Sequence, residues 1–267
     1  MHITLIGGTG LIGSRLAQRL RLAGHTVVAA APSTGVNTLT GQGLPEALQG
    51  AQVLVDVSNS PDFADQAVLD FFQTSTRQLI RAATAAGVRH YVALSIVGID
   101  RPPGNGYFRA KLAQEALIRA SALPHTIVRA TQFHEFVGAI ADAATRDGVV
   151  HATSAGIQTI AADDVALALA GVAQNAPLNG VCEIAGPQPM GMDALMRQAL
   201  ALRGDARRVV TDDAAPYFGA VLQASTLLPG PDAWLAPTTW PAWHERQSGR
   251  DNLPQTQATD TGGMMAR

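Results

Sequence analysis

Lysine and cysteine are nearly absent from this chain of 267 residues, which has one of each. The single cysteine, Cys182, excludes an internal disulfide and a metal site built from cysteines alone. Charged residues make up only 15% of the chain, whereas typical soluble domains have about 25%. Much of the surface is therefore neutral, which leaves room for an apolar pocket or for the interface of a homo-oligomer.

An excess of positive charge and a long apolar run are also missing. The formal net charge is -2, so the sequence offers no basic surface for nucleic acid and no polybasic patch for a membrane. The longest apolar run, Val165 to Ala173, is much shorter than the roughly 20 residues of a membrane helix. The N-terminus lacks the basic segment that begins a signal peptide. We expect a cytoplasmic protein that acts on a small molecule.

The chain lacks the sequence motifs of three kinds of functional site. No Gly-Lys-Ser/Thr follows the glycines near the N-terminus, which excludes a Walker-type phosphate loop. No Gly-x-Ser-x-Gly segment occurs, which disfavours a hydrolase. The pairs Asp212-Asp213 and His244-Glu245 lack the spacing of metal ligands, so we predict no metal site.

The first half of the chain alternates short apolar β-rich segments with segments of helical periodicity. This alternation is typical of an α/β fold, a doubly wound parallel sheet covered by helices on both faces. The predicted strands are His2–Ile6, His25–Ala31, Val36–Leu39, Ala51–Val57, Arg89–Ser95 and His125–Arg129. The first predicted helix begins after Gly10. The others cover Leu44–Leu48, Asp62–Ala86 and Tyr107–Ser121.

The regular alternation is lost after Arg129, which indicates a smaller C-terminal lobe over the carboxyl edge of the sheet. We predict one domain over 1–245, with its core in 1–131 and 158–175, a substrate lobe in 132–157 and 176–245, and a disordered tail in 246–267. The elements expected here are helices at Phe133–Ala144, Asp163–Ala173 and Asp193–Leu202, and strands at Val149–Ala152, Gln158–Ala161, Val181–Ile184 and Arg208–Thr211.

Glycines at positions 7, 10 and 13 separate the first predicted strand from the first helix. Such a loop makes a tight turn, lets backbone approach a pyrophosphate and lets the helix pack on the strand, while the helix N-terminus attracts the phosphates. A glycine turn without a ligand is the alternative. We predict dinucleotide binding by Gly7, Thr9, Gly10, Leu11, Ile12 and Gly13.

The end of the second predicted strand, Ala29-Ala30-Ala31, carries no acid. An acid at this point usually binds the ribose diol of NAD. Ser33 and Thr34 follow and are able to donate hydrogen bonds to a 2′-phosphate. We therefore predict NADP(H) as the preferred cofactor, with NAD(H) as the second choice and a turn without cofactor contact as the alternative for these two residues.

Ser95, Tyr107 and Lys111 are the candidate catalytic residues. Ser95 ends a predicted strand, and strand ends of open α/β sheets bind the ligand. Tyr107 and Lys111 are four residues apart and share one face of a helix. A nearby ammonium lowers the pKa of a tyrosine, which suits general acid catalysis on a carbonyl. The alternative is a packing tyrosine, a solvated lysine and a serine that ends a strand.

These segments resemble the short-chain dehydrogenase/reductase superfamily. The motifs are Gly7-Gly8-Thr9-Gly10-Leu11-Ile12-Gly13, Ser95 and Tyr107-Phe108-Arg109-Ala110-Lys111. The stretches 125–133, 160–166 and 184–187 are similar to the atypical NmrA-like NAD(P)-binding branch. The resemblance covers about residues 1–245. It implies a Rossmann-type core with strand order 3-2-1-4-5-6 and a nicotinamide cofactor.

The resemblance also implies a role for each site residue. Tyr107 would donate the proton, Lys111 would hold the nicotinamide ribose and lower the pKa of Tyr107, and Ser95 would orient the substrate oxygen. The adenosine ribose would pass Val57, Ser58 and Asn59, and the nicotinamide would face Thr131. The superfamily often has a helix asparagine for a proton relay, and Phe72 stands at that position here.

An NAD(P)H-dependent oxidoreductase, a carbonyl reductase or alcohol dehydrogenase, is the function that these residues predict. Its substrate, a small-molecule carbonyl or alcohol, would contact Val97, Phe133, His134 and Phe136, although core packing explains the phenylalanines equally well. Two other functions stay open. One is an NAD-retaining epimerase or dehydratase, and the other is a non-catalytic regulator that senses NADP(H).

Overall fold

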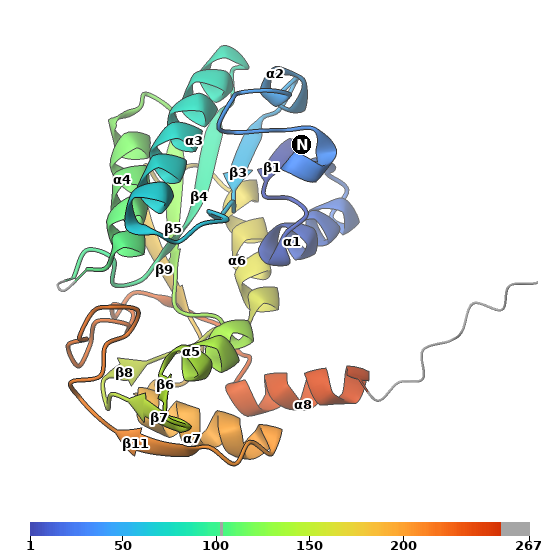
Figure 1. The fold of residues 1–267 in the computed structure, drawn as a ribbon. Coiled ribbons are helices and arrows are strands. Elements are labelled where there is room, and N and C mark those ends of the chain that lie inside the picture. The colour runs from blue at the N-terminus through green and yellow to red at the C-terminus, as the bar shows by residue number, and fades with distance from the viewer. Residues whose placement is uncertain (102–103, 252–267) are drawn as a thin grey trace, which may run out of the picture.

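The computed structural model of the protein describes residues 1–101 and 104–251. A seven-stranded sheet, in which every neighbouring pair is parallel, forms its centre (Figure 1). The strand order is β12-β9-β5-β4-β3-β1-β2. The strands are β1 (His2–Ile6), β2 (Thr26–Ala30), β3 (Val53–Asp56), β4 (His90–Ile96), β5 (His125–Ala130), β9 (Gly180–Ala185) and β12 (Trp234–Leu235). The predicted Rossmann-type α/β fold is confirmed.

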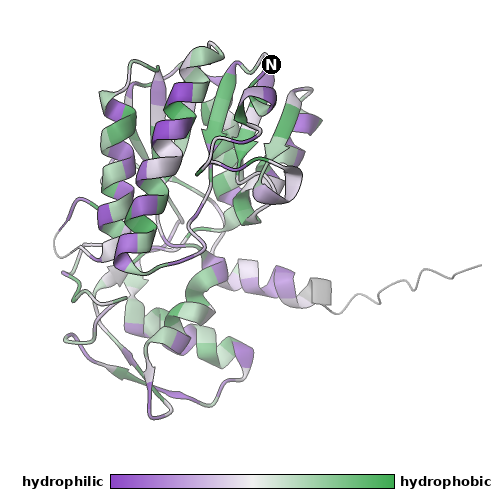
Figure 2. Cartoon of the chain, turned by 45° about the horizontal axis from the view of Figure 1, so that its top comes forward, coloured by the Kyte–Doolittle hydropathy of each residue, from purple (hydrophilic) through white to green (hydrophobic). Residues whose placement is uncertain are grey.

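Helices cover both faces of this sheet, which explains why its central strands are apolar on both sides. On one face lie α1 (Leu11–Leu22) and α6 (Ala162–Gln174), and on the other lie α2 (Leu44–Ala47), α3 (Asp65–Ala85) and α4 (Gly106–Ala120). Leu16 and Leu20 of α1 are fully buried against the sheet, as is Leu79 of α3 on the opposite face. Figure 2 shows the hydrophobic strands between helices with polar outer faces.

The predicted strand at Val36–Leu39 does not form, so the sheet lacks the third strand of the expected order. The Asn37 side chain accepts hydrogen bonds from the backbone N–H groups of Leu39 and Thr40. Such local bonds compete with strand pairing. Val36 is buried beside Leu44 instead, after a 3-10 turn, η1 (Pro32–Thr34).

The second part of the structure is a smaller lobe below the carboxyl edge of the sheet (Figure 1). Its strands form two small sheets, β11-β7-β6 and β10-β8. Their bounds are β6 (Thr145–Arg146), β7 (Val149–Ala152), β8 (Gly156–Ile157), β10 (Met190–Gly191) and β11 (Arg208–Thr211). The lobe's helices are η2 (His134–Phe136), α5 (Val137–Ala143), α7 (Met192–Arg203) and α8 (Trp240–Asp251). Val150, Met196 and Trp240 are buried in a core of its own.

Three expectations for this lobe were wrong. β9 and β12 belong to the main sheet, because β9 pairs with β5 and β12 pairs with β9. Residues 158–161 form no strand beyond a single bridge from Ile160 to Phe133. Residues 246–251 continue α8 instead of a disordered tail, while 252–267 lie outside the described residues. Within the part of the chain that the structure describes, no helix is long and apolar enough to cross a membrane.

Candidate active site

The glycine loop of residues 7–13 lies at the carboxyl end of β1 and packs closely on its neighbours. Gly7 and Gly8 both donate backbone hydrogen bonds to the carbonyl of Ala30 at the end of β2. Gly7 has a φ of +76°, and a Cβ there would lie 2.9 Å from the carbonyl oxygen of Val57. A Cβ on Gly13 would lie 2.2 Å from the carbonyl oxygen of Gly7. These glycines let the loop and α1 pack against the sheet edge.

Gly10 is different because it is exposed, and a Cβ there would meet only the Gly7 carbonyl oxygen, at 3.3 Å. It is the N-cap of α1, and no side chain caps the helix. The first N–H groups of a helix have no partner within the helix and attract an anion together with the helix dipole. The open position at Gly10 beside these donors fits a pyrophosphate, as the sequence predicts.

Ser33 and Thr34 lie in the 3-10 turn η1 after β2, and they differ in what their hydroxyls do. Thr34 Oγ1 accepts a hydrogen bond from the Ala31 N–H at 2.9 Å and lies 3.0 Å from the Ala31 carbonyl oxygen. It therefore stabilises the turn itself, which agrees with the alternative that these residues form a turn without cofactor contact. Ser33 is exposed, and the structure gives its hydroxyl no hydrogen bond among the described residues. Of the two exposed residues, only Ser33 has a hydroxyl without a partner among the described residues.

Tyr107, at the start of α4, reaches the same edge of the sheet as the glycine loop. Its hydroxyl donates a hydrogen bond of 2.9 Å to Asn59 Oδ1. Asn59 follows Val57 and Ser58, whose backbone atoms lie within 3.0 Å of the point where a Cβ on Gly7 would stand. A continuous series of contacts therefore connects the predicted proton donor to the predicted dinucleotide loop, although they are about 100 residues apart in the sequence.

The surroundings of Tyr107 are aromatic and keep its hydroxyl neutral. Its ring contacts Phe63 and Phe72, with ring centroids 5.5 and 6.0 Å away. Burial raises the pKa of Tyr107 to about 12, although the hydrogen bond to Asn59 acts the other way. The expectation that Lys111 lowers this pKa is wrong for this structure, since burial outweighs every other influence on the phenol. Tyr107 is therefore a protonated phenol at neutral pH.

Lys111 is buried, with 3% of its surface exposed, and points into the interior. Its ammonium donates hydrogen bonds to the carbonyl of Leu94, at 2.8 Å, and to Gln114 Oε1. It also lies 4.4 Å from the centre of the Phe72 ring, a cation–π contact. Burial lowers the pKa of Lys111 to about 8, with Asp56 and Glu115 acting against the fall. Two of its three N–H donors have partners among the described residues.

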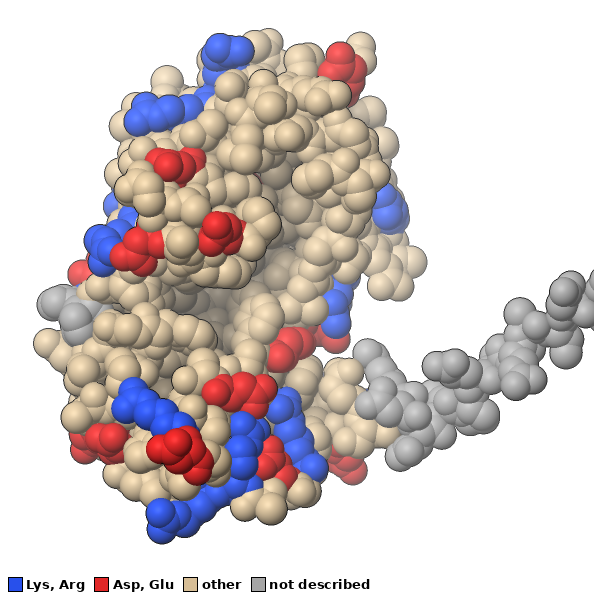
Figure 3. All heavy atoms as spheres, viewed as in Figure 1, with Lys and Arg blue, Asp and Glu red and all other residues tan. Residues whose placement is uncertain are grey.

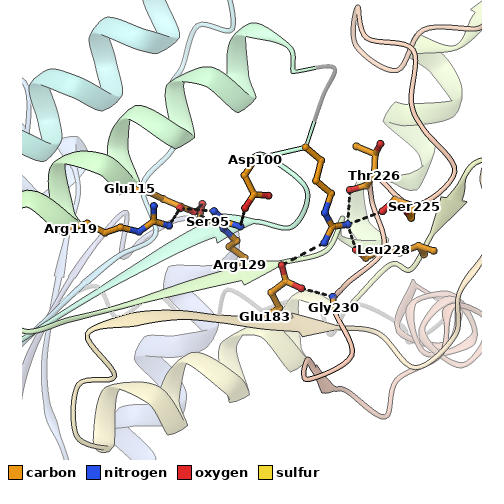
Figure 4. A network of polar contacts seen from close by, with 11 residues as sticks. Ser95, Asp100, Glu115, Arg119, Arg129, Glu183, Ser225, Thr226, Leu228 and Gly230 are labelled. Carbon is orange, nitrogen blue, oxygen red and sulfur yellow. Dashed lines mark hydrogen bonds and ion pairs between the residues drawn. The ribbon is translucent and has the colours of Figure 1, made fainter.

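The structure gives the Ser95 hydroxyl no hydrogen bond to Tyr107 or Lys111, although Lys111 bonds the carbonyl of the preceding residue, Leu94. The Ser95 hydroxyl donates a hydrogen bond of 2.7 Å to Glu115, which is held by the Arg129 guanidinium at 2.8 Å (Figure 4). Eight residues of α4 separate Glu115 from Tyr107, which is about 12 Å along a helix axis. Arg129 also bonds Asp100 at 2.6 Å. Ser95 is thus part of a buried ion-pair network between α4, β4 and β5, and its role toward a substrate stays a prediction.

The end of β5 carries two buried polar atoms that have no hydrogen-bond partner among the described residues, Thr131 Oγ1 and Gln132 Oε1. Such atoms are costly unless a ligand or water satisfies them. That the nicotinamide faces Thr131 stays a prediction of the resemblance. The unpartnered hydroxyl therefore fits a cofactor that supplies polar groups at this point.

Two of the expected substrate residues lie in the protein core. Val97 has no exposed surface. His134 is buried, with Nδ1 2.8 Å from Thr159 Oγ1 and Nε2 3.2 Å from the carbonyl oxygen of Thr238. Burial lowers the pKa of His134 to about 4, so it stays neutral and packs against the Trp240 ring. Its position is structural.

Phe133 and Phe136 stack on each other, with centroids 5.7 Å apart. Phe136 is 49% exposed and remains available to a ligand, whereas Phe133 packs against the main core.

The face drawn in Figure 3 is hollowed between the core and the lobe, and the walls of this hollow carry few charged side chains. In the lobe, a pocket of about 160 Å³ lies between α5, β7 and residues 215–219. Tyr217 lines this pocket, and burial with Tyr107 nearby raises the pKa of Tyr217. The lobe thus brings a second tyrosine toward Tyr107, which no spacing in the sequence indicates.

Sequence reasoning also missed Asp56, Gln114 and Glu115, which surround Lys111. Asp56 is the only acid in the apolar strand β3 and is 1% exposed. A lone acid that ends a buried strand was a visible signal. Gln114 and Glu115 lie on α4 three and four residues after Lys111, but that spacing alone does not tell a buried contact from a solvated one.

Comparison with known protein families matches residues 7–176, more than half of the chain, to the family described as NAD(P)H-binding. The chain belongs to this NAD(P)H-binding family. The match includes the glycine loop, Tyr107 and Lys111, and it ends after α6. NAD(P)H binding, predicted from the glycine loop, is thereby confirmed at the level of the family.

Solved structures with the same fold extend the likeness of this NAD(P)H-binding protein to nearly its full length. A short-chain dehydrogenase/reductase superfamily protein from Agrobacterium tumefaciens with bound NAD has a TM-score of 0.69 at 19% identity, covering 94% of this chain and 98% of that one. An NADPH-dependent quinone oxidoreductase from Escherichia coli has a TM-score of 0.64 at 20% identity, covering 92% and 99%. These likenesses show that the chain shares the fold of these proteins.

A curated relative matches only part of the chain. The (4-alkanoyl-5-oxo-2,5-dihydrofuran-3-yl)methyl phosphate reductase of Streptomyces griseus is 31% identical over 144 residues, which are 49% of this chain and 48% of the relative. The chain thus spans about half the length of the curated relative that it matches.

Proposed function

We propose that the protein is an NADPH-dependent reductase that converts a small carbonyl compound to an alcohol, with Tyr107 as the proton donor. The series of contacts from the glycine loop through Val57, Ser58 and Asn59 to the Tyr107 hydroxyl carries this proposal. It joins a proton donor to the loop that fits a dinucleotide. The relative from Streptomyces griseus and the neighbour from Escherichia coli, a reductase and a quinone oxidoreductase by name, agree with this reaction class.

The cofactor would be held by the residues of the sheet edge. The N–H groups at the start of α1 would bind its pyrophosphate beside Gly10, the turn at 57–59 would pass its adenosine ribose, and Thr131 and Lys111 would bind near its nicotinamide. When bound, the nicotinamide supplies a hydride for the carbonyl carbon. NADPH is the proposed form, because β2 ends without an acid and the exposed Ser33 hydroxyl is free to donate to a 2′-phosphate.

Tyr107 would transfer the proton from its Oη to the carbonyl oxygen, so that a carbonyl, a hydride and a proton yield the alcohol. Its raised pKa keeps the phenol protonated at neutral pH, which is the state that a proton donor needs. The phenolate left behind would recover its proton from solvent. General acid catalysis of this kind typically contributes about 10²–10⁴-fold.

The substrate would lie in the hollow between the core and the lobe, near the exposed ring of Phe136 and the aromatic rings beside Tyr107. The neutral walls of the hollow favour a compact, partly apolar molecule. Quinones and alkanoyl-substituted furanone phosphates, the compounds named for the two relatives, are therefore the first candidates to test.

Turnover tests this proposal directly. Ketones, quinones and a furanone phosphate are mixed with the protein and NADPH or NADH, and the nicotinamide absorbance is followed. We expect oxidation of NADPH with at least one carbonyl or quinone and slower oxidation of NADH. Cofactor binding without any turnover would favour the sensing regulator. NAD that stays bound through purification and is unchanged in turnover would favour the epimerase or dehydratase.

A further inference from the structure

A chain of buried polar contacts connects Asp56, at the end of β3, to Lys111 on α4. The Lys111 ammonium donates to Gln114 Oε1, and Gln114 Nε2 donates to Asp56 Oδ2 at 2.9 Å. The three side chains are buried, with exposures of 1% for Asp56, 1% for Gln114 and 3% for Lys111. The Gln114 amide is thus a bridge between a buried anion and a buried cation.

The direction of this bridge is fixed by chemistry. An ammonium only donates hydrogen bonds and an ionised carboxylate only accepts them. Between the two, the Gln114 amide has to turn its oxygen to Lys111 and its nitrogen to Asp56. A flipped amide would place two donors together at Lys111 and two acceptors together at Asp56. The amide therefore holds the ammonium at one position beside the carbonyl of Leu94.

Asp56 is the acid near Lys111 that forms no direct ion pair among the described residues. Its carboxylate accepts hydrogen bonds from the neutral groups of Ser58, Tyr91 and Gln114. Glu115, the other nearby acid, forms ion pairs with Arg129 and Arg119. The charged groups that act on Lys111 are Asp56 of β3 and Glu115 of α4. Behind them, Tyr91 of β4 bonds Asp56 and Arg129 of β5 bonds Glu115, and Tyr107 precedes Lys111 by one turn of α4.

We propose that Asp56 and Gln114 are positioning residues for Lys111, and that Asp56, through the Gln114 amide, keeps the ammonium charged and fixed in the interior. The proposal rests on the proposed function for its purpose, since Lys111 lies one helical turn from Tyr107, the proposed proton donor. It also explains how the site works with Phe72 at the relay position. The apolar Phe72 ring packs on one side of the ammonium, and the Gln114 bridge supplies the polar partner.

The chain contains a single lysine, so the ammonium of Lys111 can be observed alone. Protein with ¹³C-labelled lysine gives one side-chain Cε signal, whose shift reports the pKa of Lys111 without any turnover. Wild type should titrate at about 8. Asp56→Asn removes the charge at nearly constant shape and should lower the pKa of Lys111 by about one unit or more. Tyr91→Phe is the matched control, because it removes a neutral donor to Asp56 and should leave this pKa nearly unchanged.

Gln114→Met is the second variant, for the case that Asp56→Asn does not fold. It keeps the Asp56 charge but removes the acceptor of the charged lysine, and should lower the pKa of Lys111 by about half a unit. In carbonyl reduction, the high-pH fall of kcat/KM should move down by the same amount in each variant. Unchanged titration of Lys111 in both variants would overturn the proposal. A shifted titration in a protein that reduces nothing would instead contradict the proposed function alone.

Discussion

Tyr107 and Lys111 are four residues apart on α4, and burial moves their pKa values in opposite directions. A phenol is charged when it loses its proton, whereas an amine is charged when it keeps it. Burial disfavours both charged forms, so it raises the pKa of Tyr107 to about 12 and lowers that of Lys111 to about 8. The pair therefore combines a neutral proton donor, Tyr107, with a buried ammonium, Lys111, whose charge destabilises the folded protein.

The cost of the buried ammonium predicts a pH dependence of stability. The pKa of Lys111 is 10.5 in its ordinary state and about 8 in the folded protein. Between these values the unfolded chain binds more protons, so stability rises with pH in this window. Below about pH 8 the buried ammonium is fully charged, and its whole destabilising effect on the folded protein is present. Relative to Lys111→Met, wild type should gain about 3 kcal/mol of unfolding free energy from about pH 8 to 10.5. Denaturant unfolding of both proteins across this pH range tests the prediction. Unfolding free energies that change with pH in parallel for the two proteins would contradict it.

At the scale of one side chain, we predict that Ser33 decides the cofactor preference. Ser33→Asp would place a carboxylate against the 2′-phosphate of NADPH and near the ribose diol of NADH. We expect the ratio of Kd values to move toward NADH by at least about tenfold, which is about 1.4 kcal/mol. Ser33→Asn, of similar size without the charge, is the control. If wild type already binds NADH several-fold more tightly than NADPH, the interpretation of the β2 end is wrong.

At the scale of elements, the loop between β1 and α1 uses its glycines in two ways, and two substitutions separate them. Gly10→Val should weaken NADPH binding by at least about a hundredfold, or about 2.7 kcal/mol, because its side chain projects where backbone approaches the pyrophosphate. The fold should be kept, since φ at Gly10 is -79° and only one atom is near. Cofactor titration and thermal unfolding measure both effects.

Gly13→Val serves as the contrast. Its Cβ would meet the Gly7 carbonyl oxygen at 2.2 Å, so the variant should lose stability as well as binding. Unchanged NADPH affinity in Gly10→Val would argue against the dinucleotide loop.

The elements with strong periodicity could be predicted from the sequence, and the loops could not. The strands β1, β2, β3, β4 and β5 and the helices α1, α3 and α4 lie within a few residues of their predicted bounds, because apolar periodicity and glycine punctuation mark them. The segment at Val36–Leu39 has the apolar residues of a strand, but Asn37 binds its own turn. β9 was assigned to the lobe because pairing with β5 depends on contacts far away in the sequence.

The site was predictable where motifs are local. The glycine loop and Tyr107 lie at the expected edge of the sheet. The partners of Lys111 and Ser95 were not predictable, because Gln114, Asp56 and Glu115 become neighbours only when β3, β4 and α4 pack. Burial then decides their charges, and no spacing reports burial.

At the scale of the whole molecule, Arg101 holds the segment 225–230, which precedes β12, to the core. Figure 4 labels its partners Ser225, Thr226 and Leu228. Its guanidinium donates hydrogen bonds to the carbonyls of Ser225, Thr226 and Leu228 and lies 4.0 Å from Glu183. Arg101→Met keeps the apolar stem but removes these donors. We expect a loss of about 1–3 kcal/mol in unfolding free energy and faster proteolysis within residues 215–233.

Arg109→Met is the control for this prediction, since its ion pair with Asp65 is exposed, at 58% and 70% of the two side chains. An exposed pair contributes little, so this variant should resist unfolding and proteolysis as wild type does. Equal behaviour of Arg101→Met and wild type would show that the lobe does not depend on this contact.

The most direct test of the proposed reaction compares wild type with Tyr107→Phe in two measurements on the same samples, NADPH affinity and the rate of carbonyl reduction. Phenylalanine keeps the ring that packs on Phe63 and Phe72 but lacks the proton. We predict NADPH affinity within a few-fold of wild type and a reduction rate lower by at least about a hundredfold. A variant that binds NADPH and reduces the carbonyl as fast as wild type would contradict the account, because the proton would then come from another group.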